Sequence, residues 1–119
     1  MPKKVATYCR VSVHDNARQT LAKQQQKLQE YCEKNGYEVC QTCRTVGDKS
    51  MGHQMFMKCL QDAQEKGIDT ILMASTNRIA GTVEEMQAIR EAYEAAGVAI
   101  ETLDGSHLPF KPGRLIPDF

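Results

Sequence analysis

The residues in this sequence that are best suited to chemistry are arginines close to hydroxyl side chains. Arg10 precedes Ser12 by two positions, and Arg78 follows the polar segment 75–77. A guanidinium group matches phosphate oxygens with paired donors, and a serine hydroxyl held between arginines can attack a phosphodiester. Phosphoryl transfer depends mostly on positioning and charge neutralisation, so arginines can substitute for metal ions. These residue types therefore suit phosphoryl transfer.

Gln24 is a further polar residue, and the helical periodicity predicts that it faces the interior. It lies three residues after Leu21 and four before Leu28, on the apolar stripe of a predicted helix. A buried amide needs hydrogen-bond partners, so Gln24 either bonds to a neighbouring strand end or reaches the site. His14 is close to Ser12 in sequence, but no oxyanion motif supports a hydrolase, and we interpret His14 as a surface residue.

Motifs for competing chemistries are absent from the sequence. It has no Gly-x-x-x-x-Gly-Lys-Ser/Thr loop, no Gly-x-Gly-x-x-Gly after the first strand and no Gly-x-Ser-x-Gly elbow. A receiver-like domain would place acidic residues where Arg10 stands. A small-molecule or nucleotide-binding α/β domain remains an alternative, without a glycine loop to cradle a phosphate.

Three helices and four strands are predicted to position these side chains. Helical periodicity covers about residues 17–35, 54–66 and 82–96, and each is followed by a glycine that can adopt the left-handed conformation. Thr82 and Glu85 have the spacing of a capping box. Strand-like runs cover residues 4–9, 37–45, 69–74 and 98–103. The alternation predicts an α/β fold with a mainly parallel sheet covered on both faces.

Each predicted helix has an apolar stripe that should face the sheet. The stripes are Ala17, Leu21, Leu28 and Cys32; Met55, Phe56, Cys59, Leu60 and Ala63; and Val83, Met86, Ile89 and Tyr93. In open α/β sheets, ligands gather beyond the carboxyl ends of the strands. Segments 10–12, 48–50 and 75–78 and Asp104 should therefore converge on one edge.

Length and composition indicate one globular domain. The chain has 119 residues, 41% of them hydrophobic, and its 15 Lys and Arg balance 15 Asp and Glu. Zero net charge argues against a free-standing, non-specific nucleic-acid binder. No apolar run is long enough to cross a membrane and no signal core follows the N-terminus, so we expect a soluble, cytoplasmic protein.

The five cysteines favour a reduced compartment, because their number is odd and they lack the pattern of a secreted scaffold. Cys40 and Cys43 have the spacing of a metal or redox pair, but no second pair completes four zinc ligands. They lie in a predicted strand, where residues three apart point to opposite faces. We interpret them as small core residues, with a metal or redox role as the alternative.

The chain opens with the motif Tyr8-Cys-Arg10-Val-Ser12, which is followed by Thr20-Leu-x-x-Gln24 on a predicted helix. This opening resembles that of the serine recombinase (resolvase/invertase) catalytic domain. Asp48 ahead of Ser50 and Gly52 resembles that family's Asp-x-x-Ser-Gly segment, and Asn77-Arg78 resembles its Asp-Arg pair. The similarity extends from Lys4 to about Leu115. It implies a three-layer αβα resolvase-like fold whose central sheet has about four or five strands.

The resemblance also implies an activity, the concerted cleavage and exchange of DNA strands through a 5′-phosphoserine intermediate. Ser12 would be the nucleophile, Arg10 would bind the scissile phosphate, and Arg78 would stabilise the transition state or assist proton transfer. Tyr8 and Gln24 would support the site. The family acts as a dimer or tetramer, and it uses no metal and no diffusible cofactor.

Three departures from the family's pattern leave a second interpretation open. His53 stands where the family has an arginine after its Ser-Gly segment, and Asn77 replaces the aspartate before Arg78. Gly81 also stands where the family has a further arginine. Losing one preorganised cation can cost about 10²-fold in rate. The chain is therefore either a recombinase with a variant active site or a catalytically silent resolvase-like domain with an assembly or regulatory role.

The chain divides into a catalytic domain, residues 1–105, and an irregular tail, residues 106–119. Pro112, Gly113, Arg114 and Leu115 resemble the entry to the family's long dimerisation helix, and Pro117 fits only near a helix start. We expect that helix to be truncated and the DNA-binding module to be absent from this chain.

Overall fold

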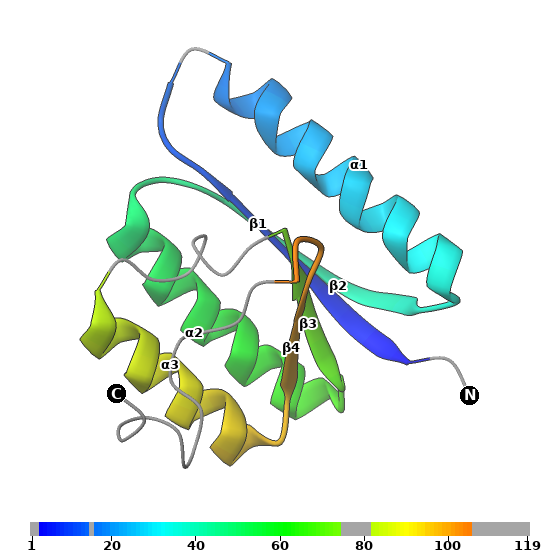
Figure 1. The fold of residues 1–119 in the computed structure, drawn as a ribbon, viewed down its shortest axis with the longest axis vertical. Coiled ribbons are helices and arrows are strands. Elements are labelled where there is room, and N and C mark those ends of the chain that lie inside the picture. The colour runs from blue at the N-terminus through cyan, green and yellow to red at the C-terminus, as the bar shows by residue number, and fades with distance from the viewer. Residues whose placement is uncertain (1–2, 15, 75–81, 106–119) are drawn as a thin grey trace.

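Four parallel strands alternate with three helices in the computed structural model, which describes residues 3–14, 16–74 and 82–105 (Figure 1). The order of the elements is the predicted β-α-β-α-β-α-β. In chain order they are β1 (Lys4–Val11), α1 (Ala17–Asn35), β2 (Glu38–Val46), α2 (Lys49–Lys66), β3 (Thr70–Met73), α3 (Val83–Ala96) and β4 (Ala99–Thr102). The predicted tail, residues 106–119, lies outside the described residues.

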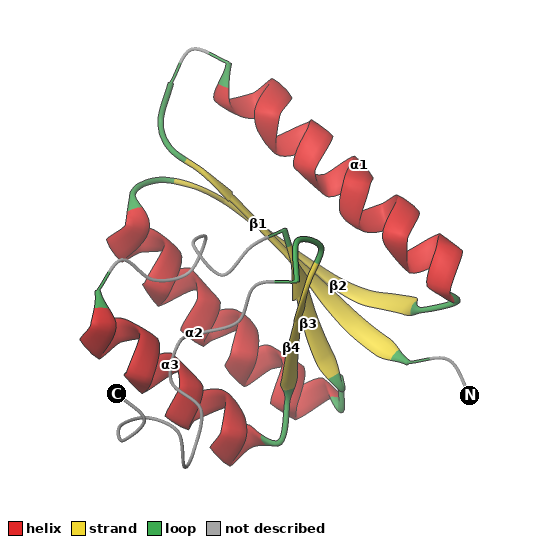
Figure 2. Cartoon of the chain, in the orientation of Figure 1, coloured by secondary structure: helices red, strands yellow, loops and turns green. Residues whose placement is uncertain are grey.

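The sheet has the strand order β2-β1-β3-β4, and each neighbouring pair is parallel. Helix α1 covers one face, while α2 and α3 lie side by side on the other, so the fold has three layers (Figure 2). The predicted α/β class and parallel sheet are confirmed. Since all four strands run the same way, the ends of β1 and β2 and the starts of the helices that follow them share one edge.

The helix ends follow the local signals in the sequence. Gly36, Gly67 and Gly97 each close a helix with φ near 70°, the left-handed conformation that glycine adopts without steric cost. The Thr82 hydroxyl accepts a hydrogen bond from the Glu85 backbone, and the Glu85 carboxylate accepts one from the Thr82 backbone. The predicted capping box of α3 is therefore confirmed.

The predicted start of the second helix is wrong by five residues. Helix α2 begins at Lys49 rather than near Gln54, because Asp48 caps it. The Asp48 carboxylate accepts a hydrogen bond of 2.9 Å from the Met51 backbone. Segment 48–53, which we predicted as part of a loop, is therefore the N-cap and first turns of a helix.

The core has two parts, one on each face of the sheet. On the α1 face, the buried cluster is Val5, Cys9, Leu28, Cys32 and Leu72. The face of α2 and α3 holds a larger cluster, which includes Tyr8, Phe56, Ile71, Met73 and Ile89. The predicted stripes are confirmed except at Val83, which is 53% exposed because it lies in the first turn of α3.

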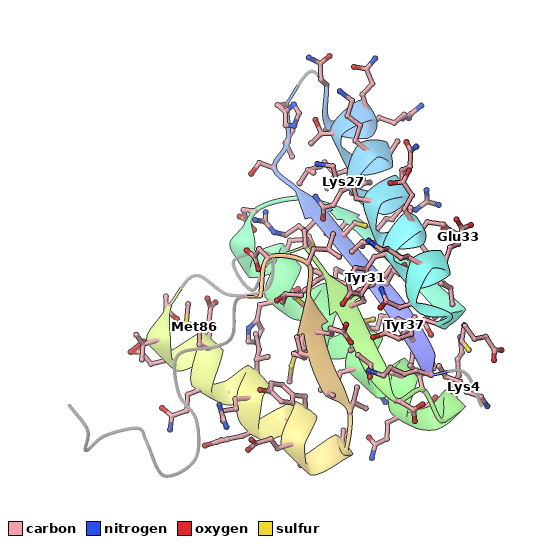
Figure 3. All side chains as sticks on the ribbon, turned by 45° about the vertical axis from the view of Figure 1, so that its right-hand side comes forward. Lys4, Lys27, Tyr31, Glu33, Tyr37 and Met86 are labelled. Carbon is pink, nitrogen blue, oxygen red and sulfur yellow. The ribbon has the colours of Figure 1, made fainter. Side chains whose placement is uncertain are left out.

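A polar cluster around Glu101 joins the edge strand β4 to α1 and to the first residues of the chain. Glu101 accepts hydrogen bonds from the hydroxyls of Tyr31 and Tyr37, at 2.5 and 3.0 Å, and pairs with Lys3 at 3.2 Å. Figure 3 shows Tyr31 on α1 next to Tyr37, and their rings meet edge to face at 5.9 Å. The cluster links β4 to α1 and to the starts of β1 and β2.

None of the helices within the described residues is both long and apolar enough to span a membrane.

Candidate active site at the ends of β1 and β2

Arg10 lies near the end of β1 and is buried, with only 4% of its surface exposed. Its guanidinium Nη1 donates a hydrogen bond of 2.8 Å to the carbonyl oxygen of Gly47, which follows β2. Gly47 in turn donates its backbone N–H to the Val11 carbonyl at 2.9 Å. The two strand ends are thus joined, and the positive charge of Arg10 lies between them. Burial limits the screening of this charge by salt.

Ser12 is the first residue after β1, and its side chain is exposed. It lies two residues beyond Arg10, in the segment that leads to α1. Within the described residues, Arg10 and Ser12 therefore share the end of the same strand, as predicted. The hydroxyl is accessible to a large substrate, while the arginine is fixed beneath the surface.

Gln24 fixes the backbone of Arg10 from the opposite face of the sheet. It is 8% exposed on α1, and its Oε1 accepts a hydrogen bond of 3.1 Å from the Arg10 backbone N–H. Its Nε2 donates to the Arg10 carbonyl oxygen at 3.3 Å. Of the two alternatives from the sequence, the described contacts match the first, a bond to a neighbouring strand end. Gln24 positions the residue that carries the charge.

Tyr8 supports the same strand from the α2 side. Its ring is fully buried against Phe56, and its hydroxyl donates to the Gly52 carbonyl oxygen at 2.7 Å. Burial raises the pKa of Tyr8 well above its ordinary value, although the charge of Arg10 opposes that rise. Tyr8 therefore stays neutral as a hydrogen-bond donor and fixes the first turn of α2 against β1.

Three further predicted site residues lie at or near the start of α2, whose first turn is held against β1 by Tyr8. They are Asp48, Ser50 and His53. Asp48 is the N-cap, so its carboxylate is directed to the helix backbone. His53 lies one residue after Gly52, and its Nδ1 is buried with no hydrogen-bond partner among the described residues. Ser50 lies in the first turn of α2, which begins at the same edge as the end of β1.

Sequence reasoning missed two backbone groups of the site, the carbonyls of Gly47 and Gly52. A Cβ atom at Gly47 would lie 2.9 Å from Cγ of Met51, so a larger residue where β2 turns into α2 would have to displace the Met51 side chain. The signal in the sequence was a glycine between a strand and an N-cap residue. Asn77 and Arg78, which we also predicted, lie outside the described residues.

A basic cavity of about 260 Å³ adjoins this edge. It is lined by Thr20, Lys23, Gln24, Lys27 and Ala74. Gln24 lines this cavity and also accepts a hydrogen bond from the Arg10 backbone. Ala74 directly follows β3. Lys27 projects from α1 over the sheet (Figure 3). The two lysines make the surface beside the strand ends positive, although the whole chain is neutral.

Comparisons with known proteins give the family and the fold of the chain. The sequence profile described as "Resolvase, N terminal domain" matches residues 5–116. No curated protein sequence matches the chain.

Among solved structures, the chain is similar to the C-terminal catalytic domain of ISC1926 TnpA, an IS607-like serine recombinase. The TM-score is 0.71 at 22% identity, over 84% of this chain and 69% of that one. It is also similar to the N-terminal catalytic domain of TP901-1 integrase, with a TM-score of 0.67 at 23% identity, over 86% and 78%. A resolvase family recombinase from Streptococcus pneumoniae gives 0.71 at 20% identity, over 87% and 74%. At these identities, the likenesses establish the fold.

Proposed function

The chain belongs to the resolvase family, and from that premise we propose that it is the catalytic domain of a serine site-specific recombinase, with Ser12 as its nucleophile toward a DNA phosphodiester. One observation carries this assignment. The buried guanidinium of Arg10 is held by Gly47 at the end of β1, two residues before the exposed hydroxyl of Ser12.

The reaction requires negative charge to develop at the nucleophile and at the phosphate. The Ser12 hydroxyl loses its proton as its oxygen attacks phosphorus, the bond from phosphorus to the 3′ oxygen breaks, and the departing 3′ oxygen takes up a proton. The product is a 5′-phosphoserine linkage with a free 3′-hydroxyl. A fixed cation stabilises such charge without reorganising during the step, which is the role we assign to Arg10.

The remaining residues of the proposal act around that pair. Arg78 supplies the second positive charge of the transition state, and Asn77 stands beside it in sequence. Tyr8 and Gln24 act on Arg10 and its strand through the hydrogen bonds described above. Asp48, Ser50 and His53 belong to the adjoining start of α2, where Asp48 acts through the helix cap.

The surroundings of the site favour a polyanionic substrate. Lys23 and Lys27 line the cavity next to Gln24, and no ion pair occupies either lysine within the described part of the chain. Such lysines can neutralise phosphates on either side of the one being cleaved. We assign this cavity to the DNA backbone. We further propose that the protein acts on DNA as a dimer or tetramer.

A trapping experiment with nicked DNA tests the assignment. The full chain is incubated with a pool of duplexes of randomised sequence, each nicked in one strand so that cleavage releases a short fragment and prevents rejoining. After denaturation and nuclease digestion, we expect a nucleotide adduct on the tryptic peptide 11–18. Ser12 is the only hydroxyl residue in that peptide, so the adduct would identify the nucleophile.

Ser50→Ala is the matched control, because it removes a serine hydroxyl from the first turn of α2 and leaves Ser12 in place. The adduct should persist in Ser50→Ala, vanish in Ser12→Ala and form roughly 100-fold more slowly in Arg10→Ala. An adduct that persists in Ser12→Ala would overturn the assignment. A chain that binds the duplexes but forms no adduct would favour the alternative, a catalytically silent domain.

A further inference from the structure

Two cysteine sulfurs lie unusually close together between β2 and α2. Sγ of Cys43 is 2.8 Å from Sγ of Cys59. Cys43 is half-buried on β2, opposite Tyr8 of β1, and Cys59 is 1% exposed in the core beneath α2. Both are free thiols. A disulfide has an S–S bond of about 2.05 Å, so the two sulfurs would have to approach by less than about 1 Å.

The packing around the pair holds the two elements in place. Gln41, on the same strand, donates from Nε2 to Sγ of Cys43 at 3.3 Å and to the Asp62 carboxylate of α2 at 3.4 Å. Lys66, at the end of α2, donates to Oε1 of Gln41 at 3.0 Å. These bonds connect β2 to α2 next to the cysteine pair, on the side toward the start of β2 and the end of α2. A covalent bond could therefore form with little movement of the backbone.

The two thiols differ in reactivity. The hydrogen bond between them lowers the pKa of Cys43 to about 7, against the effect of burial, and Lys66 lowers it further. The same bond and burial raise the pKa of Cys59. Thiolates are the nucleophilic form of cysteine. Cys43 is also the more exposed of the two, so it is the sulfur that an oxidant would reach first.

We propose that Cys43 and Cys59 form a reversible disulfide between β2 and α2 when the protein meets a peroxide. The Cys43 thiolate attacks one peroxide oxygen, the O–O bond breaks, and the first water leaves once the departing oxygen is protonated. Sγ of Cys59 then attacks the sulfur of the Cys43 sulfenic acid. The S–O bond breaks, and the departing oxygen takes the Cys59 proton to form the second water. The two sulfurs lose two electrons, which the peroxide gains.

The disulfide would fix the helix that carries part of the candidate site. The first turn of α2 presents Gly52 to Tyr8, and Cys59 lies two turns further along the same helix. Closing the segment 43–59 removes freedom from the unfolded chain, which raises stability. The inference stands on the cysteine geometry alone and does not depend on the proposed recombinase chemistry.

Peptide mapping of the full chain tests the proposal. The protein is treated with hydrogen peroxide, its remaining thiols are alkylated, and a tryptic digest is examined without reduction. We expect free thiols to fall from five to three and peptides 35–44 and 59–66 to become linked. A dithiol reductant should restore all five thiols. The melting temperature of the oxidised chain should rise by on the order of 10 °C.

Cys40→Ala provides the matched control. Peptide 35–44 contains both Cys40 and Cys43, whereas Cys59 is the only cysteine in peptide 59–66. The cross-link should persist in Cys40→Ala and disappear in Cys43→Ala. Because the map of the unsubstituted chain needs no variant, a folding defect in Cys43→Ala would not obscure the result. A linkage through Cys40, a linkage between two chains, or five unreacted thiols would each overturn the proposal.

Discussion

At the scale of single residues, the site depends on a charge that is in place before any substrate arrives. Arg10 is held on both sides of the sheet, by Gly47 through its guanidinium and by Gln24 through its backbone. Burying a cation costs desolvation energy, and the hydrogen bonds that hold the cation in place offset part of this cost. Such a group can stabilise a phosphoryl transition state with little reorganisation, which a mobile surface arginine cannot do.

Replacement of Gln24 by leucine should destabilise the fold. Leucine has a similar size, but it removes both hydrogen bonds to the Arg10 backbone in a buried place. We expect a loss of about 1–2 kcal/mol in the free energy of unfolding, measured by urea denaturation. Gln26→Leu is the control, because Gln26 is exposed on the same helix and bonds only to Glu30 among the described residues. Equal effects of the two substitutions would contradict the positioning role of Gln24.

At the scale of elements, helix α2 connects the edge that holds the candidate site to the core. Its N-cap, Asp48, directly follows Gly47, and its first turns present the carbonyl of Gly52 to Tyr8. Further along the helix, Phe56 packs against the ring of Tyr8. A substitution that disturbs the start of α2 should therefore also alter the structure at the end of β1.

Asp48→Ala should remove the cap of α2. The Met51 backbone N–H would lose its acceptor, and we expect the free energy of unfolding to fall by about 1 kcal/mol. Thr82→Ala provides the comparison, because it removes the equivalent acceptor from the capping box of α3. Both should destabilise the chain in denaturant titrations, but only Asp48→Ala should also slow formation of the Ser12 adduct. An unchanged rate of adduct formation in Asp48→Ala would show that the cap of α2 does not influence the candidate site.

The elements also show where sequence reasoning succeeds and where it stops. The start of α3 was predictable because Thr82 and Glu85 carry a complete local signal. The start of α2 was not, because Ser50 and Gly52 are weak helix formers, and the hydrogen bond from Tyr8 that fixes this turn comes from a distant strand.

The contact between Cys43 and Cys59 was beyond local reasoning for a related reason. The register of β1 with β2 shifts after Val39, so that Cys40 is left without a partner in the pairing. Val39 therefore packs on the α1 face, while Cys43, of the same parity, packs on the face of α2 and α3. A single bulge thus changes which residues meet across the fold. By contrast, Arg10, Ser12 and Gln24 were predictable because one strand end and one helical stripe bring them together.

At the scale of the whole molecule, Glu101 ties the edge strand β4 to segments at the start of the chain. Burial would raise the pKa of Glu101, but the hydrogen bonds from Tyr31, Tyr37 and Lys3 outweigh it and lower the pKa below 4.5. The bond to Glu101 correspondingly raises the pKa of Tyr31 to about 12. The fold therefore favours the ionised carboxylate and the neutral phenol. The bonds to Glu101 join residues up to 98 positions apart in sequence.

Glu101→Gln should change how stability depends on pH. Because the folded state lowers the pKa of Glu101, its contribution is present above about pH 4.5 and is lost as the pH falls through the folded-state pKa. Near pH 7 we expect the variant to be less stable than the unsubstituted chain by about 1–2 kcal/mol. The gap should narrow in urea titrations below pH 4.5, as the native carboxylate is protonated. Glu91→Gln, on an exposed part of α3, should show no such trend. A gap for Glu101→Gln that stays constant from pH 7 to pH 3 would show that packing of the side chain, rather than its charge, holds β4 to the rest of the fold.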